Sequence, residues 1–208
     1  MSWLELTSWK RASHFQFFKD YEQPFFNVCT EIDVSPLHAR TQQPNGPSFF
    51  LATLHAATSA ANETEAFRLR LRGDRVWRHD LVHAGSTVLR DDETFTFARI
   101  AFSTDYEEFQ RRGRTVIEDL RGGTQPLASD PAEDDVIYFS VLPWIRFTSF
   151  SNAHRFLKGE SVPRIVFGRY FERAGRQWLP ISVDVHHALV DGLDVGRFLE
   201  RLAQRCSD

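Results

Sequence analysis

Two adjacent histidines near the end of the chain carry the clearest chemical signal in the sequence. His186 and His187 follow a strand-like alternating run at 181–185, and Asp191 with Gly192 comes shortly after them. Side chains alternate along a strand, so the two rings point to opposite faces and at most one serves a given pocket. Histidine titrates near neutral pH and is the usual general base. The pattern therefore predicts either a catalytic base or a core histidine with a satisfied hydrogen bond, followed by an Asp-Gly turn.

The same geometry argues against a metal centre. Rings on opposite faces of a strand cannot easily bind one ion together. The two cysteines, Cys29 and Cys206, form neither a metal-binding spacing nor a disulfide framework. We predict no metal and two reduced thiols, as in a cytoplasmic protein.

The elements that must position these histidines are mixed along the chain. Strand-like runs are predicted at 27–34, 66–71, 75–78, 86–89, 94–102, 136–142, 164–171 and 181–185. Helical spacing is predicted at 49–62 and 106–120 and after Gly192, with a further helix start at Ser35 and Pro36 and a polar loop at 122–134. No βαβ regularity and no linker is visible. We predict an α+β fold in which residues 1–208 form a single domain, a two-layer sandwich of one large sheet with packed helices.

Composition narrows the class of protein. The chain is 42% hydrophobic and 25% charged, with a net charge of −3, which excludes a disordered, collagen-like or coiled-coil protein and argues against nucleic-acid binding. The uncharged stretch at 48–62 is too short and too polar to span a membrane, and the N-terminus lacks signal-peptide features. Phenylalanine is unusually common, with 19 residues, which favours an apolar pocket or a subunit interface.

Several segments in order resemble one family. The segment 186–192 with 195–198 resembles the C-terminal signature of the trimeric, CoA-dependent chloramphenicol acetyltransferase family. The other matching segments are 9–15, 92–95, 139–144 with 147–150, and 179–183. Together they cover essentially the whole chain. The resemblance implies the CoA-dependent acyltransferase fold, with a large mixed β-sheet.

The resemblance also implies roles for individual residues. His187 matches the general base, which removes the proton of a substrate hydroxyl. Ser140 matches the serine whose hydroxyl stabilises the oxyanion. Asp191 is expected to pair with Arg11 and hold the backbone of the site, and His186 is expected to be structural. Trp144, Arg169 and Tyr170 match positions near bound CoA.

The implied substrate pocket departs from the family pattern. Its residues are Phe17, Phe18, Phe26, Phe95, Phe97, Asn152 and Val166. Phe18 stands where many members have a tyrosine, and Val166 replaces a threonine. Phe97 replaces a smaller residue, and Glu22 and Asn152 occupy places that are usually apolar. A pocket that exchanges apolar contacts for Glu and Asn is expected to favour a more polar acceptor.

The resemblance implies an acetyl-CoA-dependent O-acetyltransferase, acting on chloramphenicol or a related small alcohol and assembled as a homotrimer. Two alternatives stay open. One is a trimeric relative that binds small molecules without turnover. The other, less favoured, is a dihydrolipoyl acyltransferase core, which normally accompanies lipoyl modules and Ala/Pro-rich linkers that this sequence lacks.

Overall fold

A large mixed β-sheet forms the centre of the computed structural model, which describes residues 1–123, 127, 134–154 and 159–207. Neighbouring strands follow the order β2 (Phe25–Asp33), β10 (Arg176–His186), β8 (Arg164–Phe167), β7 (Val136–Val141), β5 (His83–Leu89) and β6 (Phe95–Ile100). The short strand β9 (Phe171–Arg173) pairs with the start of β10. The β5–β7 and β7–β8 pairs are parallel and the other pairs are antiparallel. The predicted large mixed sheet is therefore confirmed.

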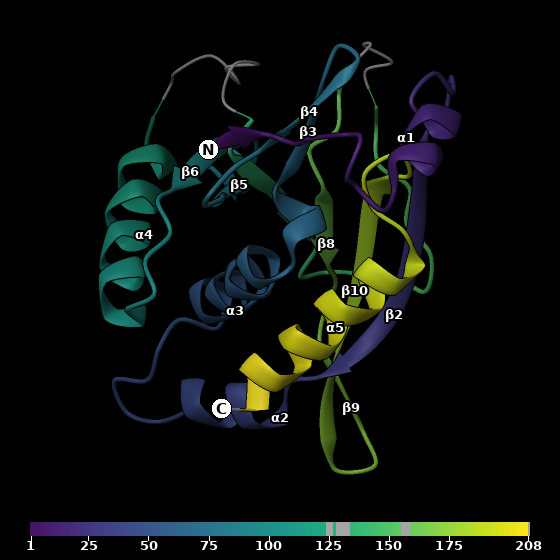
Figure 1. The fold of residues 1–208 in the computed structure, drawn as a ribbon. Coiled ribbons are helices and arrows are strands. Elements are labelled where there is room, and N and C mark those ends of the chain that lie inside the picture. Colours follow the sequence, from purple (N-terminus) through teal and green to yellow (C-terminus); the bar gives the residue numbers. More distant parts are fainter. Residues whose placement is uncertain (124–126, 128–133, 155–158, 208) are drawn as a thin grey trace.

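Helices cover one face of this sheet. They are α2 (Ser35–Thr41), α3 (Phe49–Glu63), α4 (Tyr106–Arg121) and α5 (Gly192–Ser207), and Figure 1 shows α3, α4 and α5 together on one side of the strands. The Ala-rich α3 is buried along most of its length because small side chains let neighbouring elements approach closely. Ser48 caps its start by accepting a hydrogen bond from the Leu51 amide.

The strand register divides the sheet into two faces of different character. The face toward the helices, here the helix face, is apolar; Phe139, Ile165 and Val183 lie on it and belong to the buried core. The opposite face, here the second face, carries Ser140, Val166, Ser182 and Asp184 along β7, β8 and β10, because partners in register point to the same side.

Sequence reasoning misplaced some boundaries. The strand predicted at 66–71 begins only at Leu69, in β3 (Leu69–Arg72), because a 3₁₀ turn at Glu65–Arg68 first leads the chain away from α3. The strand predicted at 164–171 breaks after Phe167. At that point the Gly168 amide still bonds Pro180, but the Arg169 amide turns to the carbonyl of Ile145.

Two further elements were not predicted, and one predicted loop lies only partly within the described residues. The opening aromatic and basic segment contains α1 (Ala12–Phe18). The strand β1 (Ser2–Trp3) joins the predicted strands β3 and β4 (Arg75–Arg78) in a separate three-stranded sheet. Most of the polar loop predicted at 122–134 lies outside the described residues.

Candidate active site

His187 follows directly on the last residue of β10 and is held on two sides by aromatic rings. Its amide donates a hydrogen bond to the carbonyl of Pro24 at 2.8 Å, and its ring stacks on Phe18 with centroids 4.1 Å apart. The Phe26 ring lies at 4.7 Å. The Nδ1 atom is 3.2 Å from the carbonyl oxygen of Val190. A carbonyl can only accept, so Nδ1 carries a proton, and in the neutral ring Nε2 is then the nitrogen with the lone pair that a general base requires.

His186 occupies a different environment from its neighbour. It is 3% exposed, its ring packs edge-on against Phe25, and its Nδ1 accepts a hydrogen bond from the Ala188 amide. Burial, with a smaller effect of the His187 charge, lowers the pKa of His186 to about 4. The two histidines thus contact consecutive residues of β2, Phe25 and Phe26, on opposite sides of the sheet, as strand alternation predicts.

An ion pair ties the N-terminal segment to the turn that follows the histidines. The Arg11 guanidinium pairs with Asp191 and also donates to the carbonyl of His187 at 3.1 Å. The other Asp191 oxygen accepts hydrogen bonds from the amides of Leu193 and Asp194, at the first turn of α5. Burial alone would raise the pKa of Asp191, but the Asp194 amide and the Arg11 charge hold it below its ordinary value.

Ser140 lies far from His187 within one chain. Ser140 pairs in register with Val166, and Val166 pairs with Ser182, so two strand spacings separate Ser140 from Ser182. His187 lies a further five residues along the chain, which puts the two Cα atoms about 19 Å apart. They also lie on different sides, because Ser140 is on the second face and the His187 ring contacts Phe26, which belongs to the helix face.

The predicted pocket residues form two groups in the structure. Phe17, Phe18 and Phe26 gather near His187, although Phe17 is 63% exposed. The second group lies with Ser140 on or against the second face. It comprises Val166 in the middle of β8, Asn152 bonded to Asp184, and the half-exposed rings of Phe95 and Phe97 on the edge strand β6.

Two of the three residues predicted near CoA line one cavity on the helix side. Arg169 and Tyr170 contribute to an apolar cavity of about 340 Å³, and Phe49 and Phe50 of α3 form another wall. Tyr170 packs against Phe49 with centroids 5.2 Å apart. Trp144 is 63% exposed and follows Pro143, which also lines the cavity. Sequence reasoning missed Phe49 and Phe50; the available signal was an aromatic pair directly after the Ser48 helix cap.

Two general features of the described part of the chain bear on function. No helix in it is both long and apolar enough to cross a bilayer. No group of three or more His, Cys, Asp or Glu side chains in the same residues is placed to hold a metal ion.

Comparison with known proteins places these features in a family. Residues 1–203 match the family model described as chloramphenicol acetyltransferase. A chloramphenicol acetyltransferase of Proteus mirabilis is 27% identical over 207 residues, covering 99% of this chain and 94% of that protein. A chloramphenicol acetyltransferase 3 of Escherichia coli is 26% identical over 204 residues, covering 98% of this chain and 95% of that protein.

A solved chloramphenicol acetyltransferase structure agrees with this fold. It superposes with a TM-score of 0.85 at 25% identity, covering 97% of both chains. From its whole-length family match and these relatives, the chain belongs to the chloramphenicol acetyltransferase family and is an acyltransferase.

Proposed function

We propose that this protein transfers an acetyl group from acetyl-CoA to a hydroxyl of chloramphenicol or a related small alcohol. The observation that carries the proposal is the packing and hydrogen bonding of the His187 ring. Its ring packs between Phe18 and Phe26, and its Nδ1 donates a hydrogen bond to the Val190 carbonyl, so Nε2 is the nitrogen that can accept a proton when the ring is neutral. Arg11 fixes the carbonyl of the same residue and so limits the motion of the ring.

The reaction follows from these atoms. His187 Nε2 accepts the proton of the substrate hydroxyl while the hydroxyl oxygen forms a bond to the thioester carbonyl carbon. Ser140 donates a hydrogen bond to the oxygen that becomes negative, and a single donor of this kind contributes about 2.7–4 kcal/mol. When the intermediate collapses, the C–S bond breaks, and the CoA thiolate takes the proton from His187. Asp191 and Arg11 position the base without touching the substrate.

A second copy of the chain is needed to complete this site. Ser140 and His187 lie about 19 Å apart and on different sides of one sheet. If both act in one site, His187 must come from one copy and Ser140 from its neighbour. We propose a homotrimer with its sites between neighbouring subunits. The exposed rings of Phe95, Phe97 and Phe17 support it, because such rings favour burial in an interface.

The apolar cavity on the helix side fits part of the CoA molecule. Its aromatic walls, Phe49, Phe50 and Tyr170, suit the adenine ring or the pantetheine arm. Arg169 brings a guanidinium suited to a phosphate, and the exposed Trp144 ring offers a further stacking surface. We assign CoA to this cavity, with Trp144, Arg169 and Tyr170 as contact residues.

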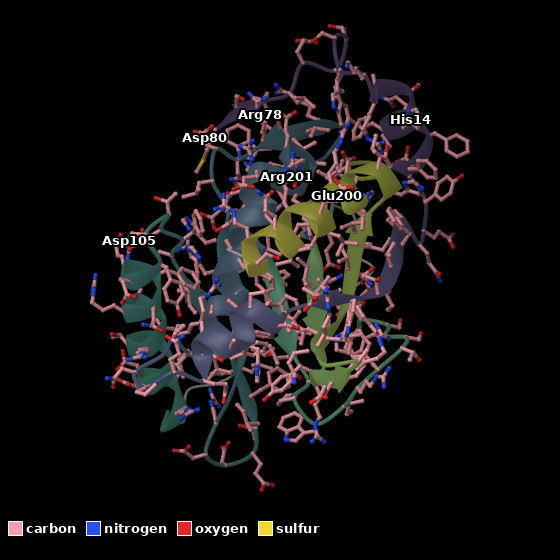
Figure 2. All side chains as sticks on the ribbon, turned by 90° about the horizontal axis from the view of Figure 1, so that it is seen from below. His14, Arg78, Asp80, Asp105, Glu200 and Arg201 are labelled. Atoms are coloured by element: carbon pink, nitrogen blue, oxygen red, sulfur yellow. The ribbon has the colours of Figure 1, made fainter. Side chains whose placement is uncertain are left out.

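The test measures release of free CoA thiol from acetyl-CoA in the presence of chloramphenicol, simple alcohols and dihydrolipoamide. We expect release with at least one alcohol and loss of it in His187→Ala. Glu200→Ala is the matched control, since Glu200 is exposed on α5, as Figure 2 shows, and should behave like the wild type. Release with dihydrolipoamide alone would favour a dihydrolipoyl acyltransferase. Absence of release with any acceptor would favour a non-enzymatic binding protein.

A further inference from the structure

One peptide group shortly after His187 contacts both the proposed base and a carboxylate. Its carbonyl belongs to Val190 and accepts the hydrogen bond of 3.2 Å from His187 Nδ1. Its N–H belongs to Asp191 and donates a hydrogen bond to Asp194 Oδ2 at 3.1 Å. The carbonyl and the N–H of a trans peptide group lie in one plane and point in opposite directions. A single rigid group therefore connects the His187 ring to the Asp194 side chain.

The turn that carries this peptide group is fixed on both sides. Before it, the amides of Leu189 and Val190 both donate hydrogen bonds of 3.0 Å to the carbonyl of His186. After it, the Val195 amide donates a hydrogen bond of 3.0 Å to the carbonyl of Asp191, at the start of α5. Val190 is only 1% exposed, so little water competes for its carbonyl. In such surroundings hydrogen bonds are electrostatically stronger than in water, and they polarise one another.

Asp194 lies partly buried in the first turn of α5, where it forms a reciprocal pair with Asp191. The Asp194 amide donates to Asp191 Oδ1 at 3.1 Å, while Asp194 Oδ2 accepts from the Asp191 amide. Burial raises the pKa of Asp194, and the hydrogen bond from the Asp191 amide opposes that rise. This arrangement is a capping box, which by itself stabilises a helix start. The hydrogen bond to Asp194 Oδ2, however, comes from the same peptide group that holds the His187 ring.

Several elements bring titratable or charged groups to this connection. Those that face the ring and Asp194 are His186 of β10, Arg11 before α1 and Asp191 beside α5, while α1 and β2 add the uncharged rings of Phe18 and Phe26. Burial lowers the pKa of His186 to about 4, so this ring carries no charge near neutral pH. The Arg11 charge acts on Asp194 and is paired directly with Asp191. Asp194 is thus the carboxylate that is bonded to the peptide group.

We propose that Asp194 is a positioning residue that makes His187 a stronger base through the Val190–Asp191 peptide group. This inference rests on the proposed acetyl transfer. A carboxylate that accepts from the N–H polarises the peptide group, so its carbonyl oxygen becomes a stronger acceptor for His187 Nδ1. The stronger acceptor stabilises the charged imidazolium that forms when Nε2 takes the proton of the substrate hydroxyl. Asp194 acts through this peptide group and not on the substrate itself.

The test measures the basicity of His187 directly. The histidines of the assembled protein are labelled with carbon-13 at Cε1. The His187 signal, identified by its loss in His187→Gln, is then titrated by NMR without substrate. Asp194→Asn keeps an oxygen that can accept from the Asp191 amide and removes only the charge. We expect the midpoint of the His187 titration to fall by at least about 0.3 pH unit in Asp194→Asn, because such polarisation strengthens a hydrogen bond by roughly 10–30%.

Matched variants separate the effect of charge from that of capping. Asp194→Glu keeps the charge and Asp194→Gln removes it, and both new residues are usual at this position of a capping box. The midpoint should stay near the wild-type value in Asp194→Glu and fall in Asp194→Gln, which gives a second comparison where Asp194→Asn fails to fold. Glu200→Gln, which removes an exposed carboxylate further along α5, should leave the midpoint unchanged. In the CoA-release assay, the acid limb of the kcat/KM profile should move to lower pH by the same amount as the midpoint.

The outcomes separate this inference from the proposed function. If the neutral Asp194 variants lose stability in urea while the His187 midpoint stays at the wild-type value, Asp194 only caps the helix and the inference is overturned. An equal shift in Glu200→Gln would also overturn it, since the effect would then reflect net charge alone. Because the titration needs no acceptor, a shift confined to the neutral Asp194 variants supports the coupling even where no acceptor releases CoA thiol. In that case the proposed acetyl transfer fails, and the coupling loses its catalytic role.

Discussion

Combining two inactive variants in one oligomer should restore activity, because Ser140 and His187 cannot meet within a single chain. Their Cα atoms are about 19 Å apart, whereas a base and an oxyanion donor acting on one substrate must both lie within hydrogen-bond reach of it. Ser140→Ala and His187→Ala each destroy one half of the site. In a mixed oligomer, an intact His187 of one subunit can face an intact Ser140 of its neighbour.

The fraction of activity that is recovered follows from the symmetry of the oligomer. In a cyclic trimer that contains both variants, only one of the three interfaces joins an intact His187 to an intact Ser140. Mixed trimers should therefore show about one third of the wild-type activity per site. A mixed two-fold dimer would instead show about one half, so the recovered fraction also reports the number of subunits.

The assay uses co-expression of the two variants with different affinity tags and purification through both tags in turn. Release of CoA thiol is then measured beside each variant alone. The rate of each single variant gives the background, and the rate of wild-type oligomers that carry both tags gives the full activity. If purified mixed oligomers show no more activity than the single variants, the shared site is refuted, and the roles of Ser140 and His187 must be reassigned.

Three further predictions concern stability. Burial places the His186 pKa near 4 against an ordinary value of 6.5, so between these values the unfolded chain binds a proton that the folded chain does not. Stability should fall by up to about 3 kcal/mol as pH drops from 6.5 to 4. His186→Gln should flatten this dependence in urea unfolding, and an unchanged slope would contradict it. Asp191→Asn loses the Arg11 ion pair but can still cap α5, whereas Asp191→Ala loses both. Asp191→Ala should therefore be about 1 kcal/mol less stable than Asp191→Asn in the same assay. Equal losses of stability in the two variants would argue against a capping role for Asp191. In Gly168→Ala the new Cβ would lie 2.9 Å from the backbone oxygen of Ile145. Its melting temperature should therefore fall, and an unchanged value would show that this loop can yield.

Local patterns in the sequence were enough to predict most helices and strands and the opposite orientations of the two histidine rings. The helices predicted at 49–62 and 106–120 end within a residue of α3 and α4. Alternation correctly sent His186 and His187 to opposite sides. These features depend on side-chain periodicity over a few residues, which backbone geometry fixes without reference to the rest of the chain.

Arrangements that join distant segments were decided only by the tertiary structure. The separation of Ser140 from His187 depends on β8 lying between β7 and β10, and no local pattern encodes that strand order. Asp184 accepts hydrogen bonds from Asn152 and His154, about thirty positions earlier in the chain, so these contacts could not be deduced from spacing. Such contacts are selected by the packing of the whole chain, because each buried polar group must find its partner wherever the fold brings one within reach.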